Sequence, residues 1–178
     1  MPHLNIELKA RCEDVDRARE VLRSHAGEFV GVDHQVDTYY ECDSGRLKLR
    51  LGDIERALIF YRRPDEALPH ASEVSVVDLG AEGESLGALL TDAIGVAVVV
   101  DKRREIYLSE NVKLHLDEVE GLGAFLEIEA RDLEGVVGEG RLREQCEEWM
   151  TLLGIAPDDL VAGSYSDLLA DRLASEER

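Results

Sequence analysis

The chain has 178 residues, 44% of them hydrophobic, and a formal net charge of −19 at pH 7. This length suits one domain, and the apolar content is sufficient for a packed core. The strong negative charge repels nucleic acids and anionic membrane surfaces, so neither is an expected partner. A local basic pocket remains compatible with this composition.

Cysteine usage and hydropathy indicate where the protein works. The three cysteines are widely spaced and form no CxxC pair, which argues against a zinc site or a disulfide framework. No N-terminal apolar run resembles a signal peptide, and apolar runs such as residues 96–100 are too short to span a bilayer. We therefore expect a cytoplasmic protein with reduced thiols.

Eight strands and four helices are predicted, in an order that indicates an α+β fold with a largely antiparallel sheet in a single domain, residues 1–178. Alternation and β-propensity predict strands at residues 5–11, 34–43, 45–53, 56–64, 71–79, 96–110, 111–123 and 124–133. Apolar spacing predicts helices at residues 13–27, 83–95, 141–155 and 164–174. The third helix has a predicted buried stripe made of Leu142, Cys146, Trp149, Met150 and Leu153.

Charged side chains alternate with apolar ones along most of these strands. In residues 5–11, Glu7 and Lys9 share one face, while Ile6, Leu8 and Ala10 share the other. We take the corresponding faces of the other strands to carry Arg46, Lys48 and Arg50; Arg62, in step with Leu58 and Phe60; Glu73 and Ser75; Lys102 and Arg104; Lys113, His115 and Asp117; and Glu127 and Glu129.

These charged faces have two interpretations. Half-exposed antiparallel strands often alternate with their charges in solvent. However, the charges sort by strand, with cations on several strands and paired carboxylates on the last, although like charges facing each other destabilise a solvated sheet. Cations also dominate these faces in an acidic protein. Eight strands are about enough to close a barrel around one small ligand. Such an interior would bind a polyanion together with a divalent metal.

Several segments in order resemble the CYTH domain family, also called triphosphate tunnel metalloenzymes. They are "NIELK", "QVDTYY", "GRLKLR", "YRRP", "DKRREIY", "VKLHLDEV", "FLEIE" and "YSDLL". The family includes class IV adenylyl cyclases, thiamine triphosphatases and inorganic triphosphatases. The resemblance implies an eight-stranded antiparallel β-barrel, or tunnel, with flanking helices, and it places the charged face of residues 5–11 inside.

The resemblance also implies roles for particular residues. Mg²⁺ or Mn²⁺ would be bound by Glu7, Glu127 and Glu129, with Asp117 available for a second metal. Lys9 would be a catalytic cation as well as a phosphate ligand. The phosphate-binding set would be Lys9, Arg46, Lys48, Arg50, Arg62, Lys102 and Arg104, with Lys113 as a weaker member and Tyr165 reaching the substrate from the C-terminal segment.

Two positions qualify this assignment. The family pattern on the first strand is Glu-x-Glu-x-Lys, and Asn5 stands in the first glutamate position. An amide offers one neutral oxygen where a carboxylate would act, so weaker metal binding is expected without loss of the tunnel. His115 shares a face with Asp117, and both a contact to phosphate and a purely structural role remain open for it.

Three functions follow from the resemblance. The first is a metal-dependent triphosphatase acting on inorganic triphosphate, thiamine triphosphate or a nucleotide. The second is a class IV adenylyl cyclase, and the third is a non-catalytic binder of polyphosphorylated ligands. No adenine-specific pattern is visible, so hydrolysis leads. The expected partner is a small-molecule triphosphate; the oligomeric state stays open, and a homodimer is consistent with the resemblance.

Overall fold

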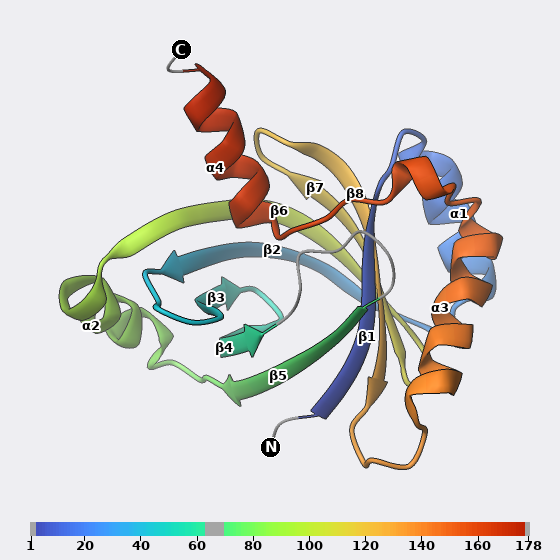
Figure 1. Ribbon diagram of the computed structural model, residues 1–178, viewed down its shortest axis with the longest axis horizontal. Coiled ribbons are helices and arrows are strands. Elements are labelled where there is room, and N and C mark those ends of the chain that lie inside the picture. Colours follow the sequence, from blue (N-terminus) through green and yellow to red (C-terminus); the bar gives the residue numbers. More distant parts are fainter. Residues whose placement is uncertain (1–2, 63–69, 177–178) are drawn as a thin grey trace.

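The structure, a computed structural model, describes residues 3–62 and 70–176. Its strands form a closed antiparallel barrel in the order β1-β5-β4-β3-β2-β6-β7-β8 (Figure 1), which confirms the predicted eight-stranded barrel. The strands are β1 (His3–Arg11), β2 (Glu28–Tyr40), β3 (Arg46–Gly52), β4 (Arg56–Arg62), β5 (His70–Asp78), β6 (Val96–Ser109), β7 (Val112–Val119) and β8 (Gly123–Asp132).

Four α-helices flank the barrel. They are α1 (Val15–His25), α2 (Gly83–Ile94), α3 (Glu139–Leu153) and α4 (Tyr165–Glu176). Figure 1 shows α1 and α3 together against one side of the barrel, α2 on the opposite side and α4 at the top of the view. Local signals set their ends: the Asp14 side chain accepts from the Arg17 N–H at the start of α1, and Gly154 ends α3 in the left-handed conformation.

The hydrophobic core lies between the barrel and the helices α1 and α3. The apolar parity of β1, with Ile6 and Leu8, packs outward onto this layer, and Leu114 of β7 and Ile128 of β8 join it. Each such side chain, when fully buried, contributes about 1.5–3 kcal/mol to folding. The predicted stripe of α3 is confirmed, with Met150 half-buried at its margin. The charged parity of the same strands therefore faces the barrel interior.

The strand β2 begins well before the predicted start at residue 34. Its N-terminal half pairs with β6, and the register shifts between Phe29 and Gly31. The sequence of this half has no clean alternation, since Phe29, Val30 and Val32 are all partly exposed. Pairing with the long strand β6 extends β2 where the side-chain pattern gives no signal.

The inner faces of β4 and β5 differ from the prediction. The residues that line the interior are Ala57, Ile59, Tyr61, Val74 and Val76, so this part of the wall is largely apolar. Apolar residues occupy both faces of β4, so alternation does not identify its inner side. This parity places Leu58, Phe60 and Arg62 on the outer face. The expectation for Glu73 concerns a side chain outside those described.

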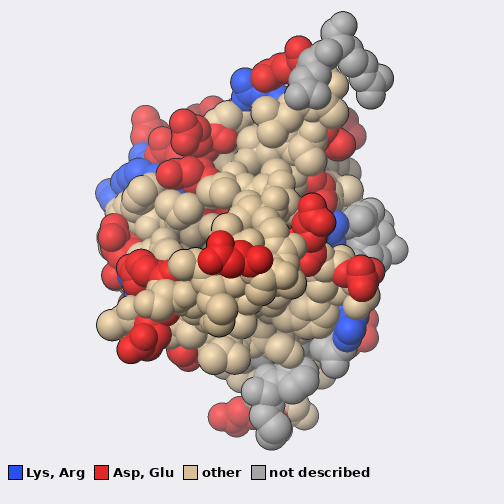
Figure 2. Space-filling model, turned by 90° about the vertical axis from the view of Figure 1, so that its left-hand side faces the viewer, with Lys and Arg blue, Asp and Glu red and all other residues tan. Residues whose placement is uncertain are grey.

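The outer surface carries the negative charge of the chain. Asp and Glu predominate among the charged side chains on the face shown in Figure 2. Cys12, Cys42 and Cys146 are free. Among the described helices, none combines the length and apolar character needed to cross a bilayer.

Candidate metal and phosphate site

A cavity of about 640 Å³ occupies the barrel interior. It collects most of the charged residues singled out in the sequence. Its lining includes Glu7, Lys9, Lys48, Arg50, Lys102, Arg104, Lys113, Glu127, Glu129 and Tyr165. The charged face of β1 is thus interior, with Lys9 only 5% exposed. We call this cavity the chamber.

Asp37 of β2 holds three cations on one wall of the chamber. Its oxygens accept from Lys48 Nζ at 2.8 Å, from Lys102 Nζ at 2.7 Å, and from Arg50 Nε and Nη2 at 2.8 and 2.9 Å. Burial alone would raise the pKa of the Asp37 carboxyl, but the three cations hold it well below its ordinary value. One carboxylate among three cations leaves this wall positive.

Lys102 is the most perturbed of these cations. Burial, opposed by Asp37 and reinforced by Arg50 and other nearby cations, lowers the pKa of its ammonium group to about 7. A charged lysine with no exposed side-chain surface is costly unless anions surround it. A polyanion in the chamber would supply that compensation.

A second carboxylate enters this wall from the turn between β3 and β4. Glu55 accepts from Arg50 Nη1 at 2.9 Å and pairs with Lys113 of β7. Asp33 fixes the turn, because its carboxylate accepts from the backbone N–H groups of Ile54 and Glu55 at 2.8 and 3.0 Å. Burial opposes ionisation of Glu55, but Lys113 and Arg50 lower its pKa strongly.

Arg104 of β6 connects the cationic wall to the opposite carboxylates. Its Nε and Nη2 donate to the two oxygens of Asp117 at 2.7 and 2.5 Å, and Nη2 also donates to Glu127 at 2.5 Å. The Tyr165 hydroxyl donates to Asp117 at 2.7 Å. Both oxygens of Asp117 are therefore engaged by Arg104 and Tyr165, and Asp117 acts here as the group that orients Arg104. Its assignment to a second metal stays a prediction.

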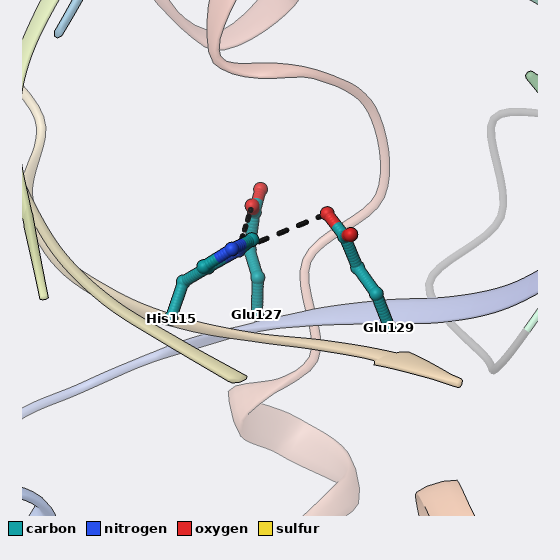
Figure 3. Close-up of side chains that lie close together, drawn as sticks. All are labelled: His115, Glu127 and Glu129. Carbon is teal, nitrogen blue, oxygen red and sulfur yellow. Dashed lines mark ion pairs between the residues drawn. The ribbon is translucent and has the colours of Figure 1, made fainter. Parts of the chain in front are cut away.

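His115, Glu127 and Glu129 form a compact group of potential metal ligands (Figure 3). One ligand atom from each lies within 4.8 Å of the others. The His115 Nδ1 atom is 3.4 Å from a Glu127 oxygen and 3.7 Å from a Glu129 oxygen. Glu7 of β1 pairs directly with Glu129 of β8 and lines the same chamber.

The electrostatics of this group suit a divalent cation. Burial, reinforced by Arg104, lowers the pKa of His115, so its imidazole is neutral at pH 7 and offers a lone pair. Within the described residues neither ring nitrogen has a hydrogen-bond partner, although His115 is only 1% exposed. Carboxylate oxygens suit Mg²⁺ and Mn²⁺, and an imidazole nitrogen favours Mn²⁺ over Mg²⁺. The residues present therefore fit the expected metal.

Lys9 lies between the metal-ligand group and the C-terminal segment. Its Nζ is 3.0 Å from a Glu127 oxygen and 4.0 Å from the centre of the Tyr165 ring. Burial would raise the pKa of Glu127, but Lys9 and Arg104 hold it well below its ordinary value. Glu127 is consequently ionised at neutral pH and available to a metal.

Arg46 and Arg62 lie apart from the chamber. Both border a second cavity of about 590 Å³ near the start of α4. Arg46 Nη2 donates to Asp167 at 2.7 Å, and the Arg62 guanidinium lies 4.8 Å from the Phe60 ring centre. The phosphate-binding role of these two arginines stays a prediction, and the structure places them at a different cavity from the other cations.

Two residues of this site were missed in the sequence. Asp37 carries a sequence signal, because it falls on the same strand face as Gln35 and Tyr39, directly opposite Arg50 in the pairing of β2 with β3. Glu55 carries no such signal, because it lies in a turn, where side-chain direction follows no period. The sequence therefore showed the cations but not the carboxylates that hold them.

Comparison with known proteins identifies the family. The CYTH domain model matches residues 3–165, and with this barrel and its charged interior it shows that the chain belongs to the CYTH domain family. A Methanocaldococcus jannaschii protein provisionally named an adenylate cyclase is 26% identical over 178 residues, covering 93% of this chain and 98% of the relative.

Solved structures share the fold. A Pyrococcus horikoshii protein superposes with a TM-score of 0.78 at 22% identity, covering 92% of this chain and 98% of that one. A Hippeastrum protein, provisionally named an adenylyl cyclase and described as having a dominant triphosphatase activity, gives a TM-score of 0.54 at 18% identity, covering 86% and 88%. At these identities the likeness concerns the fold.

Proposed function

We propose that this protein is a metal-dependent triphosphatase that hydrolyses a triphosphate in the chamber. The observation that carries the proposal is the placement of charge on opposite walls. The strand β3, with Lys48 and Arg50, stands four positions from β8, with Glu127 and Glu129, in the eight-stranded ring. A triphosphate between them meets guanidinium and ammonium groups on one side and a metal-binding group on the other.

The chain's own residues position the substrate. Lys48, Arg50 and Lys102 donate to phosphate oxygens, and their pairing with Asp37 keeps them directed into the chamber. Glu127 and Glu129, with His115 and Glu7, hold the metal. When bound, Mg²⁺ or Mn²⁺ supplies positive charge to the phosphate oxygens and lowers the pKa of a water molecule.

The reaction is attack of water on the terminal phosphorus, with cleavage of the phosphoanhydride bond and release of phosphate and diphosphate. Arg104, oriented by Asp117 and Tyr165, reaches from the cationic wall toward Glu127 and stabilises charge on the transferred group. Lys9, beside Glu127, is the second cation near the reacting phosphorus. Both side chains are buried, so little water competes with these contacts.

A class IV adenylyl cyclase is the second candidate. It is favoured by the name of the Methanocaldococcus jannaschii relative, whereas the activity described for the Hippeastrum protein favours hydrolysis. In a cyclase the same chamber would direct the ribose 3′-hydroxyl at the α-phosphorus and release pyrophosphate. A non-catalytic binder would hold the ligand without turnover.

One experiment separates these functions. Purified protein is incubated with inorganic triphosphate, thiamine triphosphate or ATP, each with Mg²⁺ or Mn²⁺. We expect metal-dependent release of phosphate, lost in the Arg104→Gln variant and retained in Arg141→Gln, which removes the same charge from the surface of α3. Cyclic AMP with pyrophosphate would establish the cyclase instead. Binding without turnover under every condition would contradict both enzymatic functions.

A further inference from the structure

One section of the chamber wall is uncharged and runs continuously across neighbouring strands. Val76 of β5 pairs directly with Ile59 of β4, and Val74 pairs with Tyr61. All four side chains line the chamber. In the ring of strands, β4 and β5 face β7 and β6, which carry the buried cations and His115. The chamber therefore has an apolar wall opposite charged ones.

This apolar wall is accessible to a ligand. Val76 is 41% exposed although it faces inward, and Ile54 and Leu133, which also line the chamber, are 44% and 60% exposed. Apolar side chains left open to solvent inside a pocket are a common feature of sites for organic ligands. The phosphates of a triphosphate gain nothing from such a surface.

Three polar side chains border this wall without using their hydrogen-bonding capacity. Asn5 pairs with Ser72 of β5 on one side and with Arg131 of β8 on the other, so the three lie in one row across the strands. Asn5 Oδ1, Ser72 Oγ and Arg131 Nε are buried and have no hydrogen-bond partner in the part of the chain that the structure describes. Such atoms cost free energy unless a ligand or water satisfies them.

The chemistry of the row specifies what would satisfy it. The carbonyl oxygen of Asn5 needs a donor, the Arg131 N–H needs an acceptor, and the Ser72 hydroxyl can serve as either. A fully ionised phosphate offers acceptors only. A planar heteroaromatic ring with ring nitrogens and an amino group offers both, and its faces pack against valine and isoleucine side chains.

We propose that Asn5, Ser72 and Arg131, with the apolar wall of Ile59, Val74 and Val76, form a subsite for the heteroaromatic group of an organic triphosphate. Together with the proposed triphosphatase function, on which this inference rests, it makes the substrate an organic triphosphate rather than inorganic triphosphate. Asn5 is then a recognition residue, and the charge of a glutamate at this position would be taken up by Arg131 across the strand pair.

The test compares affinities for inorganic triphosphate, ATP and thiamine triphosphate by isothermal titration calorimetry, without turnover, in the presence of Ca²⁺. We expect the wild type to bind at least one organic triphosphate about tenfold more tightly than inorganic triphosphate, the scale of a modest apolar contact. The arm that gains identifies whether the ring is a purine or the thiamine ring system. Equal affinity for all three would overturn the proposal.

Matched variants locate the subsite. Val76→Asn places an amide on the apolar wall, and Val77→Asn makes the same change one residue further, at a 59% exposed position on the outer face. We expect Val76→Asn and Asn5→Ala to remove the preference for the organic ligand while leaving inorganic triphosphate binding unchanged. Val77→Asn should behave as wild type.

The outcomes keep the two proposals separate. If inorganic triphosphate binds but Val76→Asn weakens every ligand equally, the subsite is wrong and the triphosphate site stands. If no triphosphate binds to the wild type, the triphosphatase function fails as well. Asn5→Glu provides a further check, because tighter Mn²⁺ binding by this variant would make Asn5 part of the metal site and contradict its assignment to ring recognition.

Discussion

Two walls of the chamber hold their charges in opposite ways. On the wall of β2, β3 and β6, the single carboxylate of Asp37 is shared by Lys48, Arg50 and Lys102. On the wall of β1, β7 and β8, glutamates predominate, and the cations among them are fewer. The first wall lacks negative charge and the second lacks positive charge. Each deficit matches one part of a metal–triphosphate complex.

The largest effect is expected from removing the carboxylate of the cationic wall. Asp37→Asn leaves three buried cations without their shared anion, which should lower the free energy of unfolding by about 3–5 kcal/mol. Chemical denaturation with urea measures this change. Inorganic triphosphate should recover much of the loss, because it brings new negative charge to the same cations.

The control is Asp101→Asn. Asp101 is an exposed partner of His34, so its substitution should cost less than about 1 kcal/mol and should not alter the response to triphosphate. Equal losses for the two variants would show that the cations of this wall do not depend on Asp37.

The carboxylate wall is tested by the double substitution Glu127→Gln and Glu129→Gln. We expect Mn²⁺ to raise the melting temperature of the wild type by mass action, equivalent to about 2.7 kcal/mol at a metal concentration of 100 times Kd. The double variant should lose this shift, since it keeps the size of both side chains but not their charge. An unchanged metal response would place the metal elsewhere. Glu144→Gln, on the surface of α3, serves as the single-charge control.

A smaller effect should appear in the pH dependence of triphosphate binding. The pKa of Lys102 is lowered to about 7 from an ordinary value of 10.5, and a bound polyanion raises it again. At pH 8 binding should therefore take up a fraction of one proton at this lysine, whereas at pH 6 the lysine is already charged. Calorimetry in buffers with different ionisation enthalpies measures the uptake. Lys102→Met removes this contribution, so the difference from wild type excludes titration of the triphosphate itself.

The same lysine affects stability with a defined sign. Between about pH 7 and pH 10 the unfolded chain holds a proton on Lys102 that the folded chain has lost, so this group's contribution to stability rises with pH. Below pH 7 both states are protonated, and the full cost of burying the charge remains. In Lys102→Met this part of the pH dependence should be absent.

The smallest effect separates Arg46 from the rest of its strand. Arg46→Gln breaks a partly exposed ion pair with Asp167 and should cost no more than about 1 kcal/mol. Lys48→Gln, one pleat further into the chamber, should weaken triphosphate binding more than Arg46→Gln does. Equal weakening by both variants would mean that the bound phosphates extend to the cavity beside α4.

The value of sequence alternation depended on the contrast between the two faces of each strand. On β1, β3, β7 and β8 one parity is apolar and the other charged, so the interior positions of Lys9, Arg50 and Glu129 were predictable. On β4 both parities carry apolar residues, and the assignment of Arg62 to the interior followed the only charge in sight. The helix α3 was predictable because its apolar spacing matches its buried side.

The polar row beside the apolar wall needed the three-dimensional structure. Asn5, Ser72 and Arg131 are far apart along the chain, and only the pairing of β1 with both β5 and β8 brings them together. Glu55 likewise gains its role from a turn fixed by Asp33. Long-range register and turn geometry are the parts of this site that local patterns do not encode.

The pairing of β1 with β8 also has a consequence for how the protein is made. Glu7 and Glu129 meet across this seam, which joins the first strand of the ring to the last. During synthesis β1 waits for β8 to emerge, with one edge of its backbone unpaired and prone to association with other chains. Contacts between such distant segments form slowly. The cluster of metal ligands is therefore completed only when the ring closes, so a nascent or truncated chain has the cations of the chamber but lacks the means to hold a metal.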